Sequence, residues 1–196
     1  YCAGTFVNVD SSTISDSASD GIELSQAALT VKDSVITKNK ALGIAARPST
    51  NDDFNVQTSE ISENSGGITF TAGWNNTDIT ISGNQIINNT NDGINLNPSN
   101  SDTLKFTDTG VSGNLISGNR VGLRYKDGFD RTLTISGNHI ANNTSHEIYN
   151  ENDYPIIADG NSWGTETTQE LDNSKLNLTR IHDSRDDVEK GQEAVV

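Results

Sequence analysis

Charged and aromatic side chains are densest in one short stretch of the sequence, from Arg124 to Arg131. Basic groups and rings stand there beside two carboxylates, a combination that can pair with an acidic sugar and stack on its ring. In a polysaccharide lyase, Arg124 or Lys126 would act as the base, while Asp127 or Asp130 would hold Ca²⁺. With a tryptophan from an earlier loop, the candidate carbohydrate-binding residues are Trp74, Arg124, Tyr125, Lys126, Asp127, Asp130 and Arg131.

Each of these candidates has a second interpretation. The charges of residues 124–131 would also suit a solvated loop in which they pair with one another. The ring of Trp74 would serve as a platform for a sugar, or it would lie over its own loop. No catalytic residue is assigned, because the sequence shows no second element that would complete an active site.

Metal ligands are sparse in the sequence. The acidic pairs Asp52-Asp53 and Asp186-Asp187 keep Ca²⁺ as a candidate, although no calcium-loop motif is present. No metal site and no cofactor is assigned on this basis. The single cysteine, Cys2, allows no internal disulfide. The histidines lack the spacing of a metal site and are expected to be solvated: His139, His146 and His182.

The chain is strongly acidic. It has 13 basic and 27 acidic residues, which give a formal net charge of −14. Such a surface argues against nucleic acid and against an anionic membrane as partners, because both select basic proteins. No apolar run of about 18 residues is present, so no membrane insertion is expected. The sequence starts at Tyr1 without an initiator methionine, which we interpret as a mature form or an excised piece of a secreted or cell-surface protein.

The elements that must position these side chains are visible as a repeat. A two-residue motif that ends in isoleucine or leucine recurs at intervals of 22 to 29 residues, and we call it the step. In five of its six copies the first residue is glycine. The copies are Gly21-Ile22, Gly43-Ile44, Gly67-Ile68, Gly93-Ile94, Gly122-Leu123 and Glu147-Ile148. Six or seven residues before each step stands a further isoleucine, in the series Ile14, Ile36, Ile61, Ile86, Ile116 and Ile140.

Within each short run the apolar residues alternate with polar ones, which is typical of strands with one face inward. Three such runs per repeat predict an all-β fold: a single-stranded right-handed parallel β-helix of about six to seven coils. The hydrophobic fraction of 32% suits a solenoid, because each coil is covered by its neighbours. The long connections follow the Gly-Ile strand and crowd one flank. That strand is expected to present outward Glu23, Ala45, Thr69, Asn95, Arg124 and Tyr149.

Two polar columns mark the corners of the predicted coils. One contains Ser12, Ser34, Ser59, Asn84, Asn114 and Asn138, and the other contains Ser17, Asn39, Asn64, Asn89, Asn119 and Asn143. Asparagine tolerates the left-handed backbone of a tight corner, and its amide can bond to the equivalent amide one coil away. We therefore predict that these columns are structural.

Two segments resemble repeats of the pectin-lyase-like, NosD-like superfamily of right-handed β-helices: Ile81–Asn89 (ISGNQIINN) and Ile135–Asn143 (ISGNHIANN). The resemblance extends from about residue 5 to residue 164. Asn161-Ser162-Trp163-Gly164-Thr165 resembles the sequence that often ends such helices, and Trp163 is expected to plug the core. The superfamily contains polysaccharide lyases, hydrolases, epimerases and surface modules, so the resemblance implies a fold rather than one activity. The Asp-Pro-His sequence of its alginate epimerases is absent.

From this resemblance we expect coils over residues 1–164 and a capping segment over residues 165–196, with a short helix at Thr168–Leu176. The leading hypothesis is an extracellular or cell-surface module that serves as a scaffold or as a polysaccharide-binding surface. The alternative is a carbohydrate-active enzyme, a lyase or epimerase that acts on an acidic polysaccharide.

The first coil has little sequence ahead of it to cover its apolar end. Val7, Val9, Ile14 and Ile22 line that coil, and only six residues precede Val7. An uncovered coil end offers edges for association. We therefore expect self-association through this face, or a missing N-terminal part of the same helix that covers it.

Overall fold

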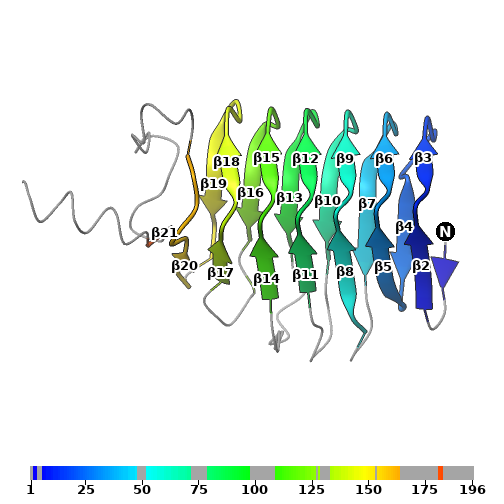
Figure 1. Cartoon of the computed structure of the whole chain (residues 1–196), viewed down its shortest axis with the longest axis horizontal. Helices are drawn as coiled ribbons and strands as arrows, with labels where there is room; N and C mark the ends of the chain where they lie inside the picture. The colour runs from blue at the N-terminus through cyan, green and yellow to red at the C-terminus, as the bar shows by residue number, and fades with distance from the viewer. Residues whose placement is uncertain are drawn as a thin grey trace, which may run out of the picture.

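The computed structural model describes residues 2–3, 6–47, 52–71, 79–97, 109–126, 128, 133–152, 154–163 and 181–182. These residues form strands without helices, and the strands stack as successive coils along one axis (Figure 1). Every strand pairs in parallel with its equivalents in the neighbouring coils. No helix in the described part of the chain is long and apolar enough to span a membrane.

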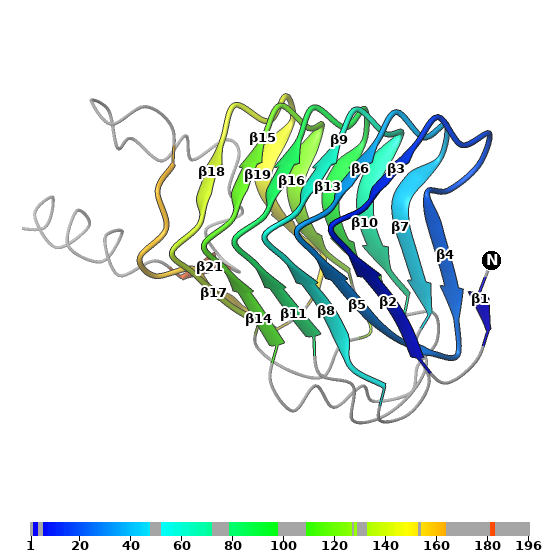
Figure 2. The same cartoon turned by 45° about the vertical axis from the view of Figure 1, so that its right-hand side comes forward.

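Three sheets form the three faces of the solenoid (Figure 2). The seven-stranded sheet contains β1 (Cys2–Ala3), β4 (Ile22–Ser25), β7 (Leu42–Arg47), β10 (Gly66–Phe70), β13 (Asp92–Leu96), β16 (Val121–Tyr125) and β19 (His146–Asn150). The eight-stranded sheet contains β2 (Phe6–Asp10), β5 (Ala28–Lys32), β8 (Phe54–Gln57), β11 (Ile79–Ser82), β14 (Thr109–Ser112), β17 (Leu133–Ser136), β20 (Ile156–Ile157) and β21 (Ile181–His182). The six-stranded sheet contains β3 (Thr13–Ser15), β6 (Val35–Thr37), β9 (Glu60–Ser62), β12 (Gln85–Ile87), β15 (Leu115–Ser117) and β18 (His139–Ala141).

The predicted β-solenoid and its register are confirmed. The isoleucines from Ile14 to Ile140 pair in one column of the six-stranded sheet, and those that follow Ile14 are fully buried. The step residues from Ile22 to Ile148 pair in one column of the seven-stranded sheet. Each buried isoleucine contributes about 1.5–3 kcal/mol relative to exposure, so these columns provide much of the stability.

Both polar columns form hydrogen-bonded ladders between coils. Asn64 donates from its backbone N and from Nδ2 to Oδ1 of Asn89, over 3.0 and 3.1 Å, and Asn89 repeats both bonds to Asn119. Each Nδ2 also reaches a carbonyl of the preceding coil, as Asn89 does at Ile61 over 3.1 Å. The buried side-chain amides of Asn64 and Asn89 are thus paired, as buried amides require.

The left-handed backbone expected of the ladder residues lies instead one position earlier. Positive φ occurs at Lys38 and Gly83, each directly before a ladder asparagine, while Asn39 and Asn84 themselves are not left-handed. The ladder residue must aim its amide along the stack, so the reversal of direction falls on its neighbour. The asparagines therefore serve as hydrogen-bonding groups, and the preceding residue makes the corner.

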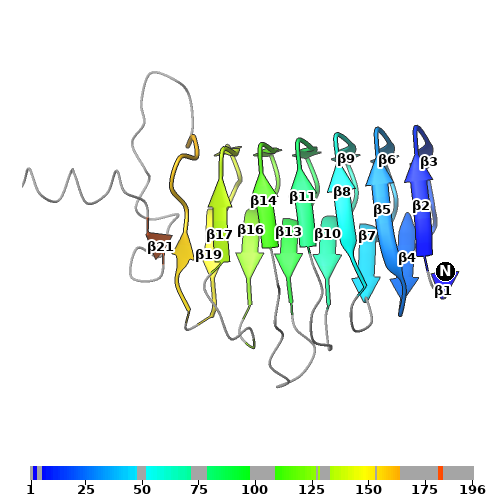
Figure 3. The ribbon, with the colours of Figure 1, turned by 60° about the horizontal axis from the view of Figure 1, so that its bottom comes forward.

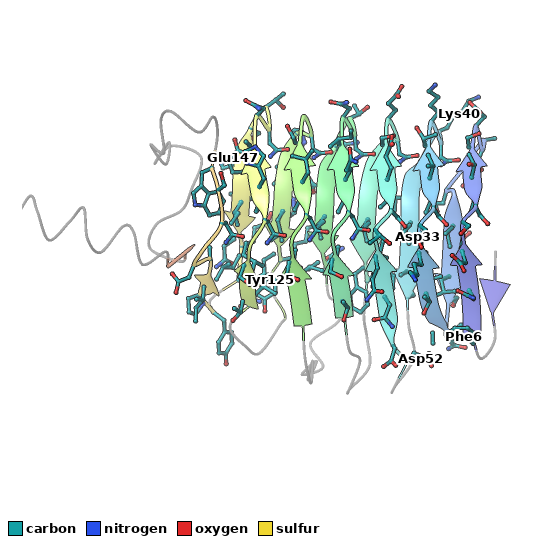
Figure 4. The ribbon with its side chains drawn as sticks, in the orientation of Figure 1. Phe6, Asp33, Lys40, Asp52, Tyr125 and Glu147 are labelled. Carbon is teal, nitrogen blue, oxygen red and sulfur yellow. The ribbon has the colours of Figure 1, made fainter. Side chains whose placement is uncertain are left out.

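The glycine of the step is required by close packing at the corner. A Cβ on Gly67 would lie 2.2 Å from the carbonyl oxygen of Gly93. Glu147 replaces this glycine after Asn143, beyond which the described residues contain no further asparagine of this ladder. Its Oε2 accepts from Nδ2 of Asn143 over 2.5 Å, so a carboxylate ends the ladder. Figure 4 shows Glu147 near one end of the solenoid and Phe6 at the other.

The two ends of the described helix differ. Trp163 is 4% exposed and joins the core, which confirms that it plugs the helix. β21 pairs with β20 and extends the eight-stranded sheet by one strand of the predicted capping segment. The expected helix at Thr168–Leu176 lies outside the described residues. At the other end, Val7, Val9 and Ile14 pack against the core and are only partly buried.

Candidate functional site

The outer face of the seven-stranded sheet carries one row of outward side chains along the solenoid. The register pairs Glu23 with Ala45, Ala45 with Thr69, and so on along the row to Asn95, Arg124 and Tyr149. This row was expected from the sequence. The strands β7, β10, β13 and β16 end along the same edge of the sheet (Figure 3). This face therefore presents one row of side chains on a rigid scaffold.

A hollow lies on this face over β4, β7 and β10, which we call the β7 hollow. Its volume is about 330 Å³, at the lower end of the range of roughly 300–1,000 Å³ for small-molecule sites. It exists because the short side chain of Ala45 stands between the longer Glu23 and Thr69 in the row. The hollow is lined by Asp20, Glu23, Leu24, Ser25, Leu42, Ala45, Ala46, Arg47, Thr69 and Thr71.

The charged groups of the β7 hollow are held by the strand register. Oδ1 of Asp20 accepts a hydrogen bond from the backbone N of Leu42 over 2.8 Å, which fixes that carboxylate at the rim. Glu23 and Arg47 are exposed, and among the described residues neither forms an ion pair. The hollow therefore offers two carboxylates and one guanidinium to a ligand, together with hydroxyl groups of its lining.

A second polar cluster surrounds Arg124 farther along the same face. Nε of Arg124 lies 2.6 Å from Oδ2 of Asp92, and Nη1 pairs with the carboxylate of Glu151. Nη2 of Arg120 lies 3.2 Å from Oδ1 of Asp92. The Arg124 guanidinium also lies over the ring of Tyr149, 4.9 Å from its centroid. Two carboxylates and two guanidinium groups thus form a charge-balanced network that joins β13, β16 and the end of β19.

This network fixes the protonation of Arg124. Burial alone would lower the pKa of Arg124, but hydrogen bonds and negative charge from Asp92 and Glu151 raise it above its ordinary value. The guanidinium therefore remains charged and is engaged on both sides. It stabilises the sheet and is not available as a general base, the role considered for it in a lyase.

The other predicted site residues differ in burial, and several of them lie outside the described part of the chain. Tyr125 is 1% exposed and lies in the inward column, which corrects its assignment as a ring for sugar stacking. Lys126 is half-buried directly after β16, and its backbone N donates to the carbonyl of Leu96 over 3.0 Å. The remaining candidates lie outside the described residues: Trp74, Asp127, Asp130 and Arg131.

Sequence reasoning missed the partners of Arg124. Asp92 pairs in register with Val121 and Glu151 follows β19, so both reach Arg124 only through the stacking of coils. The signal was present in the repeat: Asp92 stands directly before Gly93, at a position that Asp20 fills in an earlier coil and that the other coils fill with uncharged side chains or histidine.

Among the described residues, no three His, Cys, Asp or Glu side chains gather closely enough to hold a metal ion. His139 and His146 are half-buried rather than fully solvated. Nδ1 of His139 lies 3.2 Å from Oγ of Ser162, and Nδ1 of His146 lies 2.7 Å from Oγ of Ser145. Both histidines thus have local hydroxyl partners. His182 lies in β21, where only the backbone is described.

Comparison with known proteins agrees with this architecture. A family model described as a right-handed β-helix region matches residues 1–163, which include every described strand except β21. No curated protein and no solved structure matches the chain significantly.

Proposed function

Since the chain belongs to the family of right-handed β-helices, we propose that it is an extracellular or cell-surface module that binds polysaccharide along its seven-stranded sheet. The β7 hollow is the observation that carries the proposal. It is lined by carboxylate, guanidinium and hydroxyl groups, which match the hydroxyl-rich surface of a sugar.

A solenoid suits this function because its outward row is rigid and linear. Successive coils place equivalent side chains about 4.8 Å apart, and the ladders hold each strand in register. A polymer can therefore contact several strands without ordering the protein, which reduces the entropic cost of binding. The same rigidity allows the module to act as a scaffold.

The enzymatic alternative has less support from the described residues. Arg124 is engaged by Asp92 and Glu151 and cannot take a proton from a substrate in this arrangement. Ultraviolet absorbance of the unsaturated product, measured with alginate and pectate, tests directly for a lyase. Formation of that product would mean that the protein is an enzyme rather than a binding module.

The binding proposal is tested by filling the β7 hollow. Ala45→Phe places a ring in the hollow at an outward strand position, where the fold tolerates aromatic residues. We expect the wild type to bind glycans on an array and Ala45→Phe to lose roughly tenfold or more in affinity.

Thr80→Phe is the matched control, because Thr80 is a partly buried residue between the inward Ile79 and Ile81 of the eight-stranded sheet. It should leave glycan binding unchanged. Absence of glycan binding by the wild type would refute the proposal, and equal losses in both variants would refute the assignment to the hollow.

A further inference from the structure

The charges of the β7 hollow indicate which kind of sugar it takes. Asp20 and Glu23 place two carboxylates in its lining, against the single guanidinium of Arg47. The whole chain carries a formal charge of −14, so a polyanion would be repelled both by the molecule and by the hollow. The uronate polymers expected for a lyase are therefore poor ligands for this site.

The arrangement of these charges is asymmetric. Asp20 precedes β4 and Glu23 lies within it, whereas Arg47 ends β7, opposite Ser25 in the register. The carboxylates thus lie toward the start of the strands and the guanidinium toward their end. The hydroxyl-bearing side chains in the lining are Ser25, Thr69 and Thr71.

We infer that the β7 hollow binds a sugar unit with a free amino group, its ammonium at Asp20 and Glu23 and its hydroxyls toward Arg47 and Thr71. This inference rests on the proposed function and names its ligand class. An ammonium is a three-donor group that a pair of carboxylates can satisfy, and such charge-assisted bonds are the strong ones. Acetylation of the amine would remove its positive charge and its complementarity to the two carboxylates.

The test compares oligomers of glucosamine, of N-acetylglucosamine and of galacturonate, which carry positive, neutral and negative charge. Isothermal titration of the full chain should show binding of the glucosamine oligomer. Affinity for the acetylated oligomer should be roughly tenfold weaker or more, because a charge-assisted hydrogen bond is lost. Galacturonate should not bind.

The variant Glu23→Gln removes one carboxylate and should weaken glucosamine binding roughly tenfold. Glu60→Gln is its control for general attraction between a cationic sugar and an acidic protein. Glu60 pairs in register with Gln85 on the six-stranded sheet, so glutamine is already present in that column. This control should bind as the wild type does.

The outcomes separate the two proposals. Equal binding of the glucosamine and acetylated oligomers, unchanged in Glu23→Gln, would overturn the amino-sugar inference and leave polysaccharide binding intact. Equal losses in Glu23→Gln and Glu60→Gln would also overturn it, because attraction would then be nonspecific. If none of the oligomers and no glycan on the array binds, both proposals fail.

Discussion

At the scale of single residues, the same amino-acid type has different roles according to its place in the coil. Arg120 and Arg124 both pair with Asp92, but their side chains are 48% and 11% exposed. Water screens the outer pair, whereas Arg124 lies between two carboxylates and over a ring. The inner arginine should therefore matter far more to stability.

Replacing Arg124 by methionine tests this difference. The change removes the Arg124 cation from the carboxylates of Glu151 and Asp92, and we expect a loss of about 2–3 kcal/mol in the free energy of unfolding. Urea denaturation followed by circular dichroism measures it. Arg120→Met should cost less than about 1 kcal/mol. Similar losses in the two variants would show that the network is not organised around Arg124.

The corner residues give a second prediction at this scale. Lys38 has a φ of 58°, in the left-handed region, whereas Lys40 does not. Gly118, also left-handed, occupies the corner position equivalent to Lys38 three coils later. Lys38→Gly should therefore stabilise the protein by about 0.5–1 kcal/mol, because glycine relieves the strain of the left-handed backbone.

Lys40→Gly is the matched change without that strain. It should destabilise the protein by about 0.5–1 kcal/mol, since glycine loses more entropy on folding. Thermal melting of both variants gives the signs. A destabilised Lys38→Gly variant would mean that the corner is not strained.

At the scale of elements, the ladders determine how one coil joins the next. Asn89 is 1% exposed and connects three coils: it accepts from Asn64 and donates to Ile61 and Asn119. Deleting a central amide should therefore affect groups on both sides of it. The glycine of the step and the ladder lie at the same corner. A side chain larger than glycine therefore cannot enter that corner to fill the space of a deleted amide.

Asn89→Ala should lower the free energy of unfolding by about 3 kcal/mol or more, because several buried donors and acceptors lose their partner. Asn91, two residues later, is exposed and donates to Oγ of Ser65 over 3.2 Å. Asn91→Ala should cost less than about 1 kcal/mol. Equal melting temperatures for the two alanine variants would contradict a structural role for the ladder.

At the scale of the whole molecule, stability is the sum of coils and of the interfaces between them. The end coils have only one neighbour. Trp163 and β20 cover the C-terminal coil of the described helix, whereas Val9 in the first coil is partly buried and Val31 in the second is fully buried. Among the described residues, the apolar side chains of the first coil are thus less covered than their equivalents in the second coil.

We predict that this chain self-associates through the end of its first coil, as a dimer or as a poorly soluble species. Light scattering after size exclusion should show the dimer, and Val9→Asp should dissociate it. Val31→Asp is the contrasting variant and should unfold the chain, because it buries an unpaired charge. A monomer at high concentration whose stability is unchanged by Val9→Asp would exclude this association.

The repeat in the sequence was sufficient to predict the fold, the register and the inward columns. In a solenoid the contacts of each residue are with its equivalents one coil away, so the alignment of repeats is already a list of neighbours. The ladder from Asn39 to Asn143 and the plug at Trp163 follow from that alignment.

Tertiary structure alone decided which outward side chains meet. Arg124 meets Asp92 of the preceding coil and Glu151 of the following one, and the β7 hollow depends on the gap that Ala45 leaves beside Glu23. Inward positions are determined by one repeated apolar pattern, whereas outward contacts depend on side-chain length, direction and the bends at each corner. Those features vary from coil to coil, and for that reason the repeat predicted the core but not the site.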